Sequence, residues 1–145
     1  MKFHLTLLAG ALALSGCGTT GGANRETGGV LASLGVGGGD TVGASIISAM
    51  HGGLVGGSVG AGLTGAEKRT ALEAEYKALE YTPSGKVVAW TGKQNRRGEV
   101  VAAQPYQVGS QNCRQYKQTV FTGSASAIAR GTACRNPDGS WTPLT

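Results

Sequence analysis

The chain has 145 residues, of which 26 are glycine, and a formal net charge of +5 at pH 7, so there is room for one small domain. Only two histidines are present, and one of them, His4, lies in the apolar N-terminal segment. The sequence therefore offers no Ser-His-Asp or Cys-His arrangement and no cysteines at CxxC spacing, and we expect no catalytic residue, no metal, no cofactor and no enzyme activity.

The first 16 residues are a predicted export signal. Lys2 precedes a mostly apolar stretch that is too short to span a membrane. The stretch ends in Leu14-Ser15-Gly16-Cys17, the residue order of a bacterial lipobox, whose cysteine thiolate is nucleophilic enough to accept a diacylglyceryl group. We predict cleavage before Cys17 and lipidation of Cys17; the alternative is an ordinary signal peptide with a chance cysteine. Gly18 stands where an Asp favours inner-membrane retention, which indicates the outer membrane, on a face that the sequence does not specify.

A glycine-rich region follows the anchor. Residues 17–27 are expected to be a lipidated flexible tether, because small polar residues dominate them. Residues 28–63 combine glycine with large aliphatic residues. Glycines spaced by four form one stripe of a helix, along which two backbones can approach closely, as in a glycine zipper. The expected zipper-packing residues are Gly35, Gly39, Gly43, Gly52, Gly56 and Gly60.

This spacing predicts a membrane helical hairpin over residues 28–63 that turns near Asp40. The first arm is short for a full span of about 20 residues, whereas the second arm is long enough, so full spanning and partial insertion both remain open. A flexible linker is the alternative, although linkers usually lack so many aliphatic residues. His51 inside the zipper is interpreted as a neutral side chain bonded to a neighbouring helix or facing the interface, with an intramembrane polar site as the alternative. The GxGxxG match over residues 60–65 has no strand before it and is interpreted as chance.

An amphipathic helix is predicted over residues 64–80. Thr64 and Glu67 have the spacing of a capping box, in which each side chain bonds the backbone N–H of the other residue. Leu72, Tyr76 and Leu79 lie on one face of this helix, which we expect to pack on the segment that follows.

Residues 81–145 are predicted to form a small antiparallel β domain, which makes the fold class α+β. The candidate strands are Lys86–Thr91, Glu99–Ala103 with an extension to Val108 left open, Cys113–Thr122, Ala125–Arg135 and a short strand at Trp141.

Turn chemistry and cysteine spacing predict the same hairpin register. Gly123-Ser124 suits a two-residue type II′ turn, which places Thr122 opposite Ala125. Counting outward then places Cys113 opposite Cys134 in a non-hydrogen-bonded pair, at a Cα separation that a disulfide can bridge. We therefore predict a Cys113–Cys134 disulfide.

The β domain is strongly basic, with eight Lys or Arg and two acidic residues over 81–145. Such a domain near an anionic membrane could bind phosphate-bearing headgroups or an acidic envelope polymer. The alternative is a solvated basic surface without a partner, and nucleic acid is not expected. The candidate anion-binding residues are Arg96, Arg97, Arg114, Arg130 and Arg135.

Two segments of the β domain stand out, residues 112–120 (NCRQYKQTV) and 131–141 (GTACRNPDGSW). They are the sharpest part of a likeness that covers nearly the whole mature chain, which resembles the rickettsial-type 17 kDa surface antigen lipoproteins with their glycine-zipper two-transmembrane segment. The resemblance implies an antigenic outer-membrane lipoprotein with a role in envelope integrity and no known catalysis. One departure is Pro143, where the family usually has a strand-forming aliphatic end.

We expect a structural lipoprotein that inserts into membrane lipid and forms a homo-oligomer through the zipper. The alternative is an envelope binding module whose basic domain recognises anionic lipid, lipopolysaccharide, peptidoglycan or a partner protein.

Overall fold

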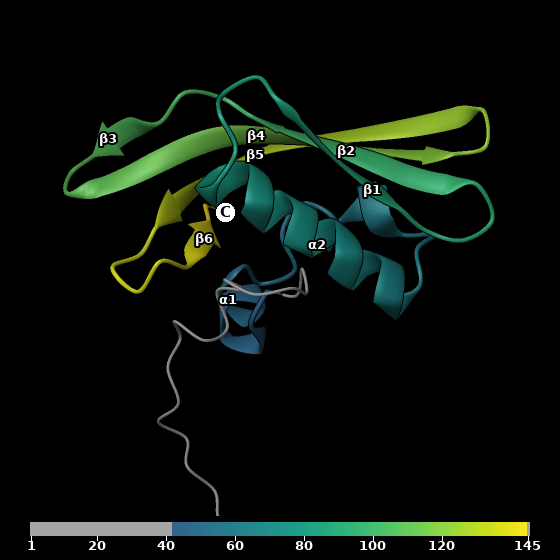
Figure 1. Cartoon of the computed structure of the whole chain (residues 1–145), viewed down its shortest axis with the longest axis horizontal. Coiled ribbons are helices and arrows are strands. Elements are labelled where there is room, and N and C mark those ends of the chain that lie inside the picture. Colours follow the sequence, from purple (N-terminus) through teal and green to yellow (C-terminus); the bar gives the residue numbers. More distant parts are fainter. Residues whose placement is uncertain (1–41, 145) are drawn as a thin grey trace, which may run out of the picture.

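The computed structural model describes residues 42–144. In chain order the elements are α1 (Ala44–Ala49), the 3-10 helix η1 (Ser58–Gly60), α2 (Gly65–Glu80), β1 (Val87–Thr91), β2 (Arg96–Ala102), β3 (Tyr106–Val108), β4 (Gln111–Thr122), β5 (Ala125–Arg135) and β6 (Trp141–Pro143). Helix α2 crosses one face of an antiparallel sheet, and α1 packs against α2 and β6 (Figure 1).

The sheet has the strand order β1-β2-β4-β5-β6, and β3 pairs with the start of β4. Because side chains alternate between the two faces of a strand, Trp90, Val100, Tyr116 and Val120 share the inner face and are buried beneath α2 and the preceding segment. The other face, which we call the open face, is covered by no helix among residues 42–144 (Figure 1).

Helix α2 begins where the sequence predicts. The Glu67 backbone N–H donates to Thr64 Oγ1 at 3.2 Å, and the Thr64 backbone N–H donates to Glu67 Oε2 at 2.8 Å, which completes the capping box. Leu72, Tyr76 and Leu79 are buried, so the predicted apolar face is the one that meets the core. The predicted amphipathic helix is confirmed.

The predicted glycine-zipper hairpin is wrong. Residues 28–41, with Gly35 and Gly39, lie outside the described residues. From Val42 onward the chain forms the six-residue α1, capped by Gly43, and then turns and η1 in place of a continuous helix. No helix within residues 42–144 has the length and apolar character needed to cross a bilayer. The described chain is mainly an antiparallel sheet with one long helix.

Backbone conformation explains why the second predicted arm does not form. His51, Gly52 and Gly53 have φ values of 47°, 87° and 55°, which end α1, because a right-handed helix needs negative φ. Gly56 and Gly60 permit close backbone contacts instead: a Cβ at Gly56 would lie 2.8 Å from the Gly52 carbonyl oxygen, and one at Gly60 would collide with the Val55 carbonyl. The four-residue spacing thus builds tight turns.

The aliphatic residues of this segment belong to the core of the domain. They pack in one cluster with α2 and the inner face of the sheet. The buried members are Val42, Ile46, Met50, Val55, Val59 and Leu63. The periodicity that suggested a lipid-facing helix therefore reflects burial against the protein itself.

A buried carboxylate fastens the segment to α2. Glu75, in the middle of α2, accepts hydrogen bonds from the backbone N–H groups of Leu54 and Val55, both at 3.0 Å. Burial raises the pKa of Glu75 to about 7, although the two backbone donors act in the opposite direction. A side chain at Gly53 would collide with this carboxylate, which explains the glycine next to the two donors.

The predicted strands are largely confirmed, with one difference in β2. That strand begins at Arg96, three residues earlier than expected, because Gln94 and Asn95 both adopt positive φ and close a tight turn with β1. The extension toward Val108 forms a separate strand, β3, which pairs with β4.

The β4–β5 hairpin has the predicted register. Thr122 pairs with Ala125 and Cys113 with Cys134, and the two cysteines form the predicted disulfide across a Cα separation of 4.0 Å. Gly123 has a φ of 59°, as the first position of a type II′ turn requires. Pro143 pairs with Ala133 and ends β6.

Candidate functional site

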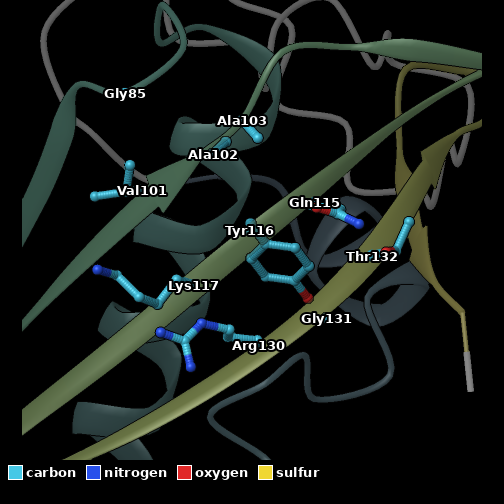
Figure 2. A pocket seen from close by; sticks show the side chains of 10 residues that line it. All are labelled: Gly85, Val101, Ala102, Ala103, Gln115, Tyr116, Lys117, Arg130, Gly131 and Thr132. Carbon is cyan, nitrogen blue, oxygen red and sulfur yellow. The ribbon is translucent and has the colours of Figure 1, made fainter.

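A hollow of about 510 Å³ lies on the open face where β2, β4 and β5 run side by side (Figure 2). The β2 side supplies aliphatic surface, β4 and β5 supply polar groups, and the hollow carries two cationic side chains. We call it the basic groove and define it by Val101, Ala103, Gln115, Lys117, Arg130 and Thr132.

The two cations of the groove are direct cross-strand partners. Lys117 of β4 pairs with Arg130 of β5, so both side chains stand on the open face, and Figure 2 shows them side by side. Within residues 42–144 neither side chain has an ion-pair partner within 4.0 Å. Like charges directly opposite each other destabilise a sheet, and an anion between them would relieve that cost.

The chemistry of the groove favours reversible anion binding. An ammonium and a guanidinium can both donate charge-assisted hydrogen bonds to a phosphate or carboxylate, and Gln115 and Thr132 add neutral donors at one end. Among the described residues no three His, Cys, Asp or Glu side chains are grouped as metal ligands.

Three of the five predicted anion-binding arginines make contacts inside the fold. The first is Arg96, whose Nη1 lies 2.8 Å from Glu67 Oε2. The pKa of Glu67 is lowered to about 2 by hydrogen bonds from the Thr64 and Lys93 backbone N–H groups and by the Arg96 side chain. Arg96 and Glu67 thus connect the β1–β2 hairpin to the start of α2.

Arg114 is buried at the other end of α2. Its Nη1 donates to the backbone carbonyls of Ala78, Leu79 and Thr82, at 3.0, 2.6 and 3.2 Å, and its Nε donates to Ala103 at 2.8 Å. The last carbonyls of a helix lack partners within that helix, so this side chain caps α2.

Arg135 forms a two-point contact with Glu80, with both N–O distances 2.8 Å, and Trp141 donates to the same carboxylate at 2.7 Å. Burial alone would raise the pKa of Glu80, but the hydrogen bonds from Arg135 and Trp141 lower it below its ordinary value. These contacts join the end of α2 to β5 and β6.

The remaining two predicted arginines lie on the open face. Arg97 stacks 3.9 Å over the Phe121 ring and lies 3.7 Å from Glu99, whereas Arg130 stands in the basic groove. The sequence reasoning missed Lys117, although the predicted hairpin register already placed it opposite Arg130. Cys17 lies outside the described residues.

Comparison with known proteins supports the resemblance. The model of a family described as 17 kDa outer membrane surface antigen matches residues 77–142. The 17 kDa surface antigen of Rickettsia bellii (strain RML369-C) is 34% identical over 97% of this chain and 94% of the relative. The Rickettsia felis protein of the same name is 40% identical over 55% of this chain and 52% of its own length. No solved structure matches the chain. The extent and identity of these matches show that the chain belongs to the 17 kDa surface antigen family.

Proposed function

We propose that this chain is an outer-membrane lipoprotein, anchored through lipid on Cys17, that holds a folded basic domain in the cell envelope. The lipobox that ends at Cys17 carries this proposal, and the family description, outer membrane surface antigen, supports the location. Attachment to the membrane would then depend on acyl chains, of which two or more give stable anchoring. Self-association through glycine stripes is not part of the proposal, because the described part of that region forms turns and short helices in place of one continuous helix, and its aliphatic residues pack in the core of the domain.

Replacing Cys17 with Ser is expected to abolish fatty-acid labelling and to leave an uncleaved precursor, because serine offers no thiolate for lipid transfer. The measurement is metabolic labelling with a fatty acid, followed by mass spectrometry of the N-terminal peptide. The double variant Cys113→Ala/Cys134→Ala is the matched control and should be labelled normally. An unmodified Cys17 at the mature N-terminus of the wild-type protein would contradict the proposal.

We further propose that the basic groove binds phosphate-bearing anions at the envelope surface. The observation in favour is the pair of cations, Lys117 and Arg130, that face each other without a counter-ion in the described part of the chain. Each charge-assisted contact contributes roughly 1.5–3 kcal/mol.

The double variant Lys117→Gln/Arg130→Gln is therefore expected to bind vesicles of anionic phospholipid at least about 10-fold more weakly than its parent. The parent carries Cys17→Ser and lacks residues 1–16, so that neither acyl chains nor the apolar N-terminal segment dominates binding in a vesicle sedimentation assay. Lys68→Gln/Lys93→Gln removes the same charge elsewhere and should lose far less affinity. Equal losses in both double variants, or binding insensitive to salt, would show that the groove has no special role.

A further inference from the structure

The outer edge of β5 is unpaired along most of its length. On one side β5 pairs with β4 from Ala125 to Cys134, whereas on the other side β6 reaches only Ala133–Arg135. The next contact on that side is the Leu144 backbone N–H, which donates to the Thr132 carbonyl at 2.8 Å. Within residues 42–144 no strand lies beside residues 125–131, which we call the free edge of β5.

The hairpin register shows which backbone groups point outward from the free edge. The Thr132 carbonyl points away from β4, toward Leu144, and residues two apart along a strand point to the same side. Ser126, Ile128 and Arg130 therefore direct their N–H and C=O groups away from β4. Each of these residues also places its side chain on the open face, beside its partner in β4.

The free edge lacks the devices that usually prevent pairing between sheets. Natural edge strands are often protected by proline, by a bulge or by several charges. Residues 125–131 contain no proline, pair with β4 without a bulge and carry one charge, that of Arg130. Ile128, in the middle, is 53% exposed, and its flanking residues are Ala127 and Ala129.

We propose that two copies of this chain pair antiparallel through the free edge of β5, with Ile128 on the twofold axis. Ile128 would then lie opposite Ile128 of the second copy, and Ser126 opposite Arg130, which makes about six new backbone hydrogen bonds. The two exposed isoleucine side chains would cover each other on the open face. The two Arg130 residues would be four residues apart along the strand direction, about 13 Å, so their charges would not oppose the pairing.

This arrangement would place the two basic grooves on one surface. Residues that face each other across a strand pair project to the same face of the sheet, so the open faces of both copies would point the same way. If the groove binds anions as proposed above, the dimer would contact an anionic surface at two points and gain avidity. The pairing itself rests on the edge geometry alone and does not require that function.

Cysteine crosslinking in cells that export the full-length chain tests the pairing. The readout is a covalent dimer on a gel, which can be scored whether or not the chain is lipid-anchored. In Ile128→Cys the two thiols of a dimer lie on the twofold, at a Cα separation of about 5.5 Å, which a disulfide can bridge. Mild oxidation should give a covalent dimer on a non-reducing gel, well above the level of wild type, and reductant should remove it. Ser126→Cys is the matched control and should not crosslink, because its thiols would be about 13 Å apart.

A second variant tests the backbone hydrogen bonds. Adding Ser126→Pro to Ile128→Cys removes a backbone N–H that points outward and leaves every hydrogen bond between β5 and β4 in place. The crosslink should therefore fall to the wild-type level, while the melting temperature changes little. Absence of an Ile128→Cys dimer, equal crosslinking at Ser126 and Ile128, or an adduct whose mass is not twice that of the chain would each overturn the proposal.

Discussion

Replacing Glu75 with Ala is expected to lower the free energy of unfolding by about 3–5 kcal/mol. The carboxylate is fully buried and accepts the backbone N–H groups of Leu54 and Val55. Without it the buried Val55 N–H is left unpaired at a cost of about 1–3 kcal/mol, the half-buried Leu54 N–H also loses its acceptor, and a cavity opens beside them. Urea unfolding followed by circular dichroism measures the loss.

The matched control for this variant is Glu73→Ala, which removes a carboxylate two residues earlier on α2. Glu73 accepts from Arg69 at 3.1 Å in an i,i+4 pair at the helix surface, where the Arg69 side chain is about half exposed, and such pairs contribute less than about 1 kcal/mol. If Glu75→Ala proved as stable as Glu73→Ala, Glu75 would not connect the glycine-rich segment to α2.

Glu75 also predicts an unusual pH dependence of stability. Its pKa is about 7 in the folded chain against an ordinary value of 4.5, so between these pH values the unfolded state loses a proton that the folded state keeps. The stabilising contribution is complete below pH 4.5 and is lost as the pH rises to 7, by about 3 kcal/mol in total. Glu75→Gln cannot ionise and should show no such loss.

The pH effect of Glu67 falls in a different range. The pKa of Glu67 is lowered to about 2, so its contribution is present above pH 4.5 and is lost as the pH falls below that value. The difference between wild type and Glu75→Gln over pH 4.5–7 therefore isolates Glu75. A difference that stays constant across this range would contradict the raised pKa.

Removing the disulfide is the second large effect that we expect. The bridge joins residues 21 apart in sequence, and the loss of chain entropy in the unfolded state then stabilises the fold by roughly 3 kcal/mol. The stabilisation is smaller if the hairpin keeps some structure in the unfolded state. Cys113→Ala/Cys134→Ala should therefore melt well below wild type in a thermal scan under oxidising conditions.

Reductant provides the control for the disulfide. Full reduction should destabilise the wild-type chain by a similar amount and leave the double variant unchanged. Since Cys17→Ser keeps the bridge, it should lose stability on reduction as wild type does. A wild-type melting temperature that does not move on complete reduction would contradict the expected contribution.

Short sequence motifs correctly predicted the start of α2 and the register of the β4–β5 hairpin. The capping box at Thr64 and Glu67 located the start of α2, and the Gly123-Ser124 turn located the register that joins Cys113 to Cys134. In both cases the residues that decide the structure lie close together in sequence or are linked by one hairpin. Such signals are readable without knowledge of the remaining fold.

The glycine-rich segment could not be predicted in this way. A spacing of four places glycines along one stripe of a helix, but the same spacing also suits successive tight turns. Which of the two structures forms depends on the residues that pack against the segment. The deciding partner is Glu75, about 20 residues further along the chain, whose carboxylate meets Leu54 and Val55.

The roles of the arginines were hidden for the same reason. Arg96 meets Glu67 across 29 residues, Arg135 meets Glu80 across 55, and Arg114 meets helix carbonyls more than 30 residues away. Composition alone counts these side chains as surface charge. Only the fold separates them from Lys117 and Arg130, whose charges have no ion-pair partner within residues 42–144.

The central claim is that the aliphatic side chains of residues 42–63 pack into the core of the domain and not against lipid. Cysteine labelling in open membrane vesicles with a membrane-impermeant maleimide tests it most directly, with Ser58→Cys and Val59→Cys as neighbours of opposite burial. We predict that Ser58→Cys reacts at once and that Val59→Cys reacts only after urea is added. If neither thiol reacts until detergent dissolves the bilayer, the segment lies in lipid and the account is wrong.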